Sequence, residues 1–260
     1  MRDSATVNYH IKSTEVQAFQ FDVDGITGNL MSPELAATQI QVQDMRDEPD
    51  LPGFATDSIT FEQHISQIKH FGESYEWRTT YDQELCSLLS NKIGAQEVVV
   101  FDHTVRIDDP NAVRKPARNV HTDYSTAGAK LRLIDLVGDK KAKDFEQGHY
   151  GFVNVWRPVE NTIKSSPLGF IRPSSVKTDD WMTIELIYPD RTGQILGVSA
   201  NEDHDWFYLS QMTPDEIAIF NIYDNGAKPF LAHSALDMEN TGDILPPRKS
   251  IESRTLVRYQ

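Results

Sequence analysis

The second half of the chain is a succession of short β-type segments separated by turn residues. From residue 117 onward, each segment is rich in β-branched and aromatic residues and is bounded by turn-forming residues such as Gly, Pro, Asn, Asp or Ser, a combination typical of strands. The candidate strands are residues 119–125, 151–158, 167–176, 181–189, 193–199, 205–212, 216–224, 230–237 and 250–259. Only residues 141–148 and 213–216 look locally helical in this half. The pattern predicts a mainly β protein, a sandwich or a barrel.

The first half is more varied. Leu85, Leu88, Leu89 and Ile93 recur at helical spacing within residues 80–95, and Gly94 is a stop signal, which predicts one amphipathic helix. Residues 96–107 then read as a strand, and residues 1–57 as extended structure that ends in a surface loop. A chain of 260 residues has the size of one β-rich domain. We therefore expect a single domain over residues 1–260, with residues 1–70 as an N-terminal extension packed on its core.

Charge and cysteine content exclude several classes of function. The formal net charge is -14 and the isoelectric point is about 4.9, whereas nucleic-acid binding rests on basic patches that neutralise phosphates. Cys86 is the only cysteine, so an internal disulfide and a thiolate-rich metal site are excluded. No apolar run approaches the length that spans a bilayer. We expect no nucleic-acid partner, no membrane association and a cytoplasmic location.

A metal site is suggested by the stretch "RNVHTDYSTAGAKLRL", residues 118–133, which we expect to run along a strand into a Gly-containing turn. Side chains two apart on a strand point to the same face, so His121 and Asp123 are placed to reach one small object together. Two histidines and one carboxylate form the facial triad of non-haem Fe(II) oxygenases. His233, at the end of an apolar strand, is the best third ligand, and His103 is its strongest competitor. Taken alone, the His-x-Asp pair also fits an ordinary solvated strand end.

The last strand carries candidate anion-binding residues. Arg248 and Ser250 lie on one face of "PPRKSIESRTLVRY", with Arg254 further along that face if the strand is regular. A guanidinium beside a hydroxyl matches a carboxylate, although a surface pair of arginines on an edge strand has the same pattern. In "NVWRP", alternation places Asn154 and Trp156 on one face and Arg157 on the opposite face.

Six ordered blocks of sequence carry a family resemblance. They are "FDHTVR", "VHTDYSTAGAKLRL", "NVWRP" followed by "PLGF", "WFYLSQMTPDEIAIFNIYDN", "AHSALD" and "PPRKSIESRTLVRY". Together they run from about residue 75 to the C-terminus. The order His-x-Asp, distal His and Arg-x-Ser resembles that of 2-oxoglutarate-dependent oxygenases. The blocks resemble the family that includes the gibberellin desaturase, the aspergillic-acid-type hydroxylase and desaturase, and the cephamycin methoxylation-associated proteins.

The resemblance implies a double-stranded β-helix, or jelly roll, with a few flanking helices. It implies Fe(II) held by His121, Asp123 and His233, with 2-oxoglutarate as cosubstrate and O2 as oxidant. Either Arg248, with Ser250, or Arg254 would bind the distal carboxylate of 2-oxoglutarate. The activity it implies is hydroxylation, desaturation or oxidative cyclisation of a small secondary metabolite, with release of succinate and CO2. A homodimer paired through the N-terminal strands is a further expectation.

Two other functions fit the same residues. A cupin-type dioxygenase or isomerase would hold a metal on the same architecture without 2-oxoglutarate, and Arg248 and Arg254 would then bind an acidic substrate directly. A non-catalytic β-sandwich binding protein would carry the His-x-Asp pair by accident. Succinate formation separates the first alternative from the oxygenase, and iron content separates the second.

Overall fold

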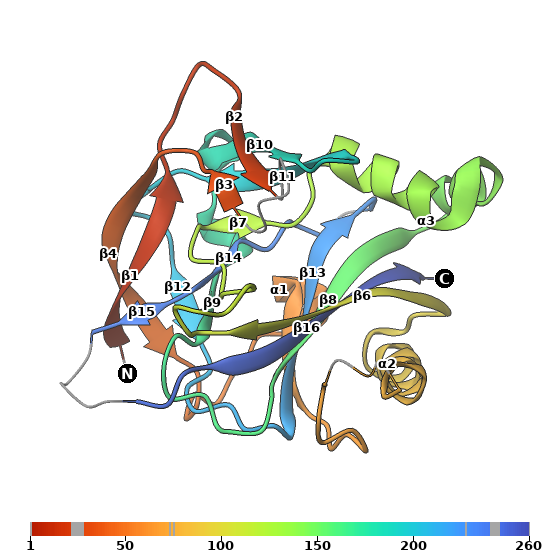
Figure 1. The fold of residues 1–260 in the computed structure, drawn as a ribbon, viewed down its shortest axis with the longest axis horizontal. Coiled ribbons are helices and arrows are strands. Elements are labelled where there is room, and N and C mark those ends of the chain that lie inside the picture. Colours follow the sequence, from red (N-terminus) through yellow and green to blue (C-terminus); the bar gives the residue numbers. More distant parts are fainter. Residues whose placement is uncertain are drawn as a thin grey trace.

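Two β-sheets face each other across a shared core (Figure 1). The computed structural model describes residues 2–21, 29–72, 74, 76–226, 228–239 and 245–259. In this part of the chain the major sheet has eleven strands in the order β15-β1-β4-β12-β9-β14-β7-β11-β10-β2-β3, and the minor sheet has five in the order β5-β13-β8-β16-β6. The mainly β expectation is confirmed.

The strand bounds are as follows. The major sheet consists of β1 Arg2–His10, β2 Gln17–Phe21, β3 Asn29–Met31, β4 Leu35–Asp44, β7 His121–Thr122, β9 Leu168–Ile171, β10 Trp181–Ile187, β11 Thr192–Val198, β12 Trp206–Tyr208, β14 His233–Ala235 and β15 Asp237–Met238. The minor sheet consists of β5 Ile59–Gln63, β6 Glu97–Ile107, β8 Tyr150–Pro158, β13 Glu216–Asp224 and β16 Lys249–Arg258. Each of the nine segments expected as strands overlaps at least one of these strands.

The first 70 residues contribute to both sheets. β1 pairs antiparallel with β4 from Arg2↔Gln43 to His10↔Leu35, and β4 in turn pairs parallel with β12. β2 pairs parallel with β10, and β5 adds an edge to the minor sheet beside β13. The extended reading of this region is therefore confirmed.

The minor sheet is covered on both faces, so its central strands are buried along their whole length. Every residue of β8 and of β13 is buried, because the inner face packs on the major sheet through Phe152 and Phe220 while the outer face packs on a helix through Val155 and Ile219. That helix is α2, Arg78–Ile93, which buries Leu85. Gly94 ends it in the left-handed conformation with φ 71°, as the stop signal predicts. Strands covered on both faces read as continuous apolar runs.

The turn expected after residue 125 was wrong, whereas the helix expected at 141–148 is the end of a longer one. Residues 126–146 form α3, Thr126–Glu146, with Gly138 in a non-helical conformation inside it. Ser125 caps the helix, since its side chain accepts a hydrogen bond from the Gly128 amide. Gly128 is needed for a close approach rather than a turn, because a Cβ there would lie 2.4 Å from the carbonyl oxygen of Gln194 on β11.

The remaining helical elements are short. α1 spans Phe54–Asp57, and 3-10 turns span Pro173–Ser175 and Thr178–Asp180. Residues 213–216, expected as helical, instead form a turn that leads into β13. No helix in the described ranges has both the length and the apolarity to cross a membrane.

Candidate metal centre

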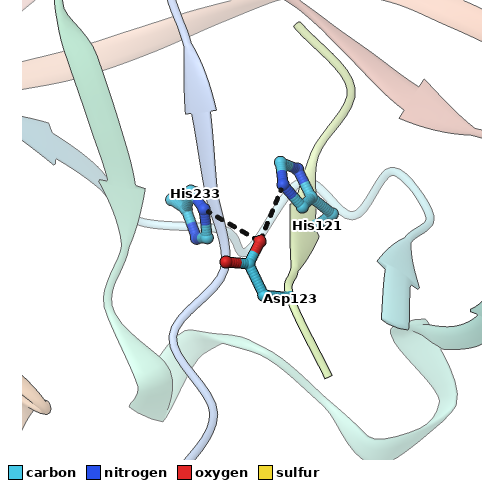
Figure 2. A group of neighbouring side chains, drawn as sticks. All are labelled: His121, Asp123 and His233. Carbon is cyan, nitrogen blue, oxygen red and sulfur yellow. Dashed lines mark ion pairs between the residues drawn. The ribbon is translucent and has the colours of Figure 1, made fainter. Parts of the chain in front are cut away.

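Two neighbouring strands of the major sheet bring His121, Asp123 and His233 together (Figure 2). β7 pairs antiparallel with β14 so that His121 lies directly opposite His233, and Asp123 follows β7 by one residue. Each of the three offers one ligand atom, and these atoms lie within 4.8 Å of one another. Asp123 Oδ1 is 3.4 Å from His121 Nε2 and 4.0 Å from His233 Nε2. His233 begins β14, whereas the sequence suggested that it ends a strand.

Backbone carbonyls orient both imidazoles. His121 Nδ1 lies 2.8 Å from the Asn119 carbonyl oxygen, and His233 Nδ1 lies 3.2 Å from that of Leu231. A carbonyl only accepts, so each Nδ1 carries a hydrogen, and the neutral imidazole then has its lone pair on Nε2, the nitrogen that faces Asp123. Metal-binding histidines use this tautomer, in which the nitrogen that does not bind the metal donates to a backbone carbonyl.

The two oxygens of Asp123 have different surroundings. Oδ2 accepts hydrogen bonds from Asn154 Nδ2 at 2.9 Å and from Arg254 Nε at 3.0 Å, while Oδ1 faces the two histidines. Burial alone would raise the pKa of the Asp123 carboxyl, but the Arg254 guanidinium outweighs it and holds that pKa well below its usual range. Asp123 is thus an anion with one oxygen fixed by the protein and one oxygen open.

His233 is neutral at neutral pH, as metal binding requires. His233 is 3% exposed, and burial, together with the neighbouring His121, lowers its pKa to about 4. Deprotonated imidazole nitrogens and one carboxylate oxygen, converging from one side, form the donor set that Fe(II) takes in non-haem oxygenases. The residues present therefore fit the metal that the sequence implied.

Arg254 is fully occupied within the protein. Its Nη1 donates to Asp102 Oδ2 at 2.7 Å, its Nη2 pairs with Glu252, and its Nε binds Asp123. These carboxylates raise the pKa of Arg254 well above its usual value, although burial alone would lower it. The guanidinium therefore positions the Asp123 carboxylate from the inner face of the minor sheet.

Arg248 has a different environment. It is 3% exposed and its guanidinium stacks on the Trp156 ring at 5.0 Å. Nε donates to Ser250 Oγ at 3.1 Å, and Nη1 donates to the Ser166 carbonyl at 2.8 Å. Among the described residues no hydrogen bond engages Nη2 and no ion pair joins Arg248 to a carboxylate. Burial, with Arg106 nearby, lowers the pKa of Arg248 to about 9.

A cleft opens beside Asp123 and His121. Two adjoining cavities of about 310 and 680 Å³ share Asp123, Leu186, Tyr188 and Ile195 in their linings, and the larger also reaches His121. One side is formed by β6 and α3, and the other by the β10–β11 hairpin. A small molecule can therefore approach the open side of the ligand set.

His103, the competing ligand, lies outside this site. It is on the outer face of the minor sheet, where Nδ1 contacts Ser253 Oγ and Nε2 contacts Asp82 Oδ1, both at 2.8 Å. Arg157 also points to that side, where it donates to the His64 and Pro214 carbonyls, while Asn154 faces the site as alternation predicted. Sequence reasoning missed Asp102 and Glu252 around Arg254; the alternation of β16 places Glu252 on its face, but no local signal marks Asp102.

The comparisons with known proteins agree with this geometry. The family model described as "Oxidoreductase/YMDC permease-like domain" matches residues 7–258. The hydroxylase/desaturase efuI of Hormonema carpetanum is 30% identical over 225 residues, which are 75% of each chain. The alpha-ketoglutarate-dependent dioxygenase phiK of Fungal sp. (strain ATCC 74256) is 29% identical over 222 residues, 78% of each chain.

A solved structure extends the likeness to the whole fold. The iron and alpha-ketoglutarate-dependent endoperoxidase NvfI superposes with a TM-score of 0.84 at 22% identity, over 99% of this chain and 98% of that one. This confirms the jelly roll. The near-complete family match and the 30% identical relative together confirm the resemblance seen in the six blocks: the chain belongs to this oxidoreductase family, among the Fe(II)- and 2-oxoglutarate-dependent hydroxylases, desaturases and dioxygenases.

Proposed function

We propose that His121, Asp123 and His233 hold the Fe(II) of a 2-oxoglutarate-dependent oxygenase that acts on a small secondary metabolite. The observation that supports this most is the convergence of two Nε2 atoms and Asp123 Oδ1 within 4.8 Å. When bound, Fe(II) with 2-oxoglutarate and O2 supplies the oxidising power, with release of succinate and CO2. The family membership favours this function over the cupin-type enzyme without 2-oxoglutarate and over the non-catalytic binding protein.

The protein's own contribution is to orient the ligands and to position the reactants. The Asn119 and Leu231 carbonyls fix the imidazole planes. Asn154 and Arg254 hold one oxygen of Asp123 so that the other faces the metal position. Because these partners are buried, the ligand set is formed before the metal arrives, which lowers the reorganisation that binding requires.

We propose that Arg248, rather than Arg254, binds the distal carboxylate of 2-oxoglutarate, with Ser250 beside it. Three carboxylates already form ion pairs with Arg254, whereas no described carboxylate forms one with the buried Arg248. A buried guanidinium without an ion-pair partner gains most from an incoming carboxylate. The Arg248→Met variant should weaken 2-oxoglutarate binding at least tenfold while Fe(II) binding changes little.

The test of the metal and cosubstrate is anaerobic titration with Fe(II) and 2-oxoglutarate, monitored by the weak visible charge-transfer band of a chelated 2-oxo acid. We expect the band in the native protein and its loss in His121→Ala, Asp123→Ala and His233→Ala. His70→Ala is the matched control, because His70 is exposed and far from the ligand set in the fold. Iron binding without the band would favour the cupin-type alternative, and a lack of stoichiometric iron would favour the non-catalytic one.

We propose that the reaction on the substrate is hydroxylation, desaturation or oxidative cyclisation. The relatives named hydroxylase/desaturase and endoperoxidase support this range. Which outcome follows depends on where the substrate carbon sits in the cleft relative to the open side of the ligand set. Mass spectrometry of products assigns it: a gain of one oxygen marks hydroxylation, and a loss of two hydrogens marks desaturation or ring closure.

We also propose that the chain is one oxygenase domain, cytoplasmic, and able to form a homodimer. The strands of the first 70 residues are hydrogen-bonded into both sheets, which supports a single domain, and the free thiol of Cys86 suits a reducing compartment. Limited proteolysis that released a stable fragment lacking residues 1–70 would contradict the first proposal. Sedimentation mass and the location of a fluorescent fusion test the other two.

A further inference from the structure

The charges of the cleft are opposite to those of the chain as a whole. The chain has 25 Lys and Arg against 39 Asp and Glu. Around the two cavities the balance reverses, with seven basic residues and three acidic ones, Asp102, Asp123 and Asp135. Besides Arg254, the basic residues are Arg106, Arg114, Lys115, Arg118, Arg132 and Arg191. A cleft lined by one sign of charge attracts ligands of the other sign.

Two of these cations have no carboxylate partner. Arg254, Arg118 and Arg191 are paired with carboxylates, but in the described part of the chain no ion pair joins Arg106 or Arg132 to one. Arg106 Nη1 donates to the Lys115 carbonyl at 2.9 Å. Arg132, on α3, lies with its guanidinium 4.8 Å from the centre of the Phe101 ring. The aromatic face holds the Arg132 fork in place and leaves its hydrogen-bond donors without a carboxylate.

Apolar side chains share the cleft walls with these cations. Phe101 and Tyr124 belong to the wall that includes α3 and β6, and Leu186 and Ile195 belong to the β10–β11 hairpin opposite. Asp123 lies in the same lining. The cleft that contains Asp123 therefore offers both apolar surface and cationic groups to a ligand.

We propose that the substrate is an amphiphilic organic acid, an apolar skeleton whose carboxylate is bound by Arg132 and Arg106 while a carbon of the skeleton is presented to the metal position. This inference rests on the proposed function, because it assigns the substrate class of the same site. A planar guanidinium fork binds a carboxylate through two parallel hydrogen bonds. The acid group would fix which carbon of the skeleton faces the ligand set.

The test uses 4-(1-pyrenyl)butyrate and its methyl ester, two fluorescent probes that share an apolar body and differ in charge. Binding is measured by fluorescence anisotropy with the full chain loaded with Mn(II) and saturated with N-oxalylglycine, which occupies the cosubstrate position. We expect the acid to bind roughly tenfold or more tighter than the ester. That ratio should fall toward one in Arg132→Gln and in Arg106→Gln, and Arg132→Lys should retain part of it. Arg2→Gln is the control, since Arg2 is exposed and outside the cleft.

Each outcome decides between the alternatives. Equal affinity for acid and ester, or an acid preference that Arg132→Gln leaves unchanged, would overturn the proposal. An acid preference that disappears when N-oxalylglycine is added would also overturn it, because the cations would then belong to the cosubstrate. On the native protein, a charge-transfer band with no acid preference refutes the substrate class alone. An acid preference without the band refutes the oxygenase function instead.

Discussion

Asn154 provides a direct test of how the Asp123 carboxylate is positioned. The side chain is fully buried on β8, and its Nδ2 donates to Asp123 Oδ2 at 2.9 Å, while its own Oδ1 has no hydrogen-bond partner. In Asn154→Leu, a nearly isosteric change, Asp123 loses one of the two donors that hold Oδ2. A hydrogen bond to a charged group contributes about 1.5 to 3 kcal/mol. Because Arg254 still holds the same oxygen, we take the lower end, which is roughly a tenfold loss of metal affinity.

The same substitution should change stability very little. The lost hydrogen bond is offset because the substitution also removes the unpartnered Oδ1, and a buried unsatisfied oxygen costs about 1 to 3 kcal/mol. We therefore expect the free energy of unfolding of the metal-free protein to change by less than about 1 kcal/mol. Asn154→Leu should therefore lower the metal affinity while leaving the free energy of unfolding nearly unchanged.

The assay is calorimetric titration with Mn(II), an air-stable substitute for Fe(II), with urea unfolding of the same samples. Asn221→Leu is the matched control: Asn221 is an equally buried asparagine on the neighbouring strand β13, its Oδ1 is also unpartnered, and its Nδ2 donates to the Pro229 carbonyl rather than to Asp123. The Mn(II) affinity of Asn221→Leu should match that of the native protein. Equal loss of affinity in the two variants, or no loss in Asn154→Leu, would refute the positioning role.

Three further perturbations follow from the structure. Arg254→Gln leaves three carboxylates without their cation and should lower the free energy of unfolding by about 3 to 5 kcal/mol, with less loss in Arg254→Lys; urea unfolding measures both, and an unchanged midpoint would contradict the ion-pair argument. Burial lowers the pKa of His10 to about 4, below the roughly 6.5 of an unfolded chain. The contribution of His10 to the free energy of unfolding, about 3 kcal/mol, is therefore complete above pH ~6.5 and is lost as the pH falls to ~4. His10→Gln should flatten the pH dependence of the free energy of unfolding between these two pH values. Gly128→Ala places a methyl group 2.4 Å from a backbone carbonyl oxygen of β11 and should cost about 1 to 3 kcal/mol in thermal unfolding, whereas Gly72→Ala, with no atom within 4 Å, should not.

The sequence predicted α2 and β6 because the residues that determine each of them lie within a single element. The leucines of α2 and the stop at Gly94 lie within one helix, and the β-branched run of β6 lies within one strand. α3 was missed because Gly128 resembles a turn residue in the sequence. Its real constraint is the approach to β11, a strand more than 60 residues later. Contacts of that kind leave no local pattern.

The site divides in the same way. Two-residue alternation was enough to place His121 and Asp123 together, although β7 has only two residues and Asp123 lies just beyond it. It also placed Asn154 on an inward face, but not against Asp123, because that contact joins two different sheets. The choice between Arg248 and Arg254 stayed open in the sequence, since both lie toward one face of the same segment. What distinguishes them is the presence of Asp102 on β6 beside Arg254.

Asp123 is the point where the two sheets meet in the site. The ligand atoms all come from the segments of the major sheet around β7 and β14, while the two donors to Asp123 Oδ2 come from β8 and β16 of the minor sheet. The direction of Asp123 Oδ1 therefore depends on the distance between the sheets, which the aromatic core sets: Phe220 on β13 contacts both Phe170 on β9 and the His233 ring, with centroids 5.2 and 5.0 Å away. A change of side-chain volume in this aromatic core should therefore also move the Asp123 carboxylate, because a close-packed interior transmits a change of volume rather than absorbing it.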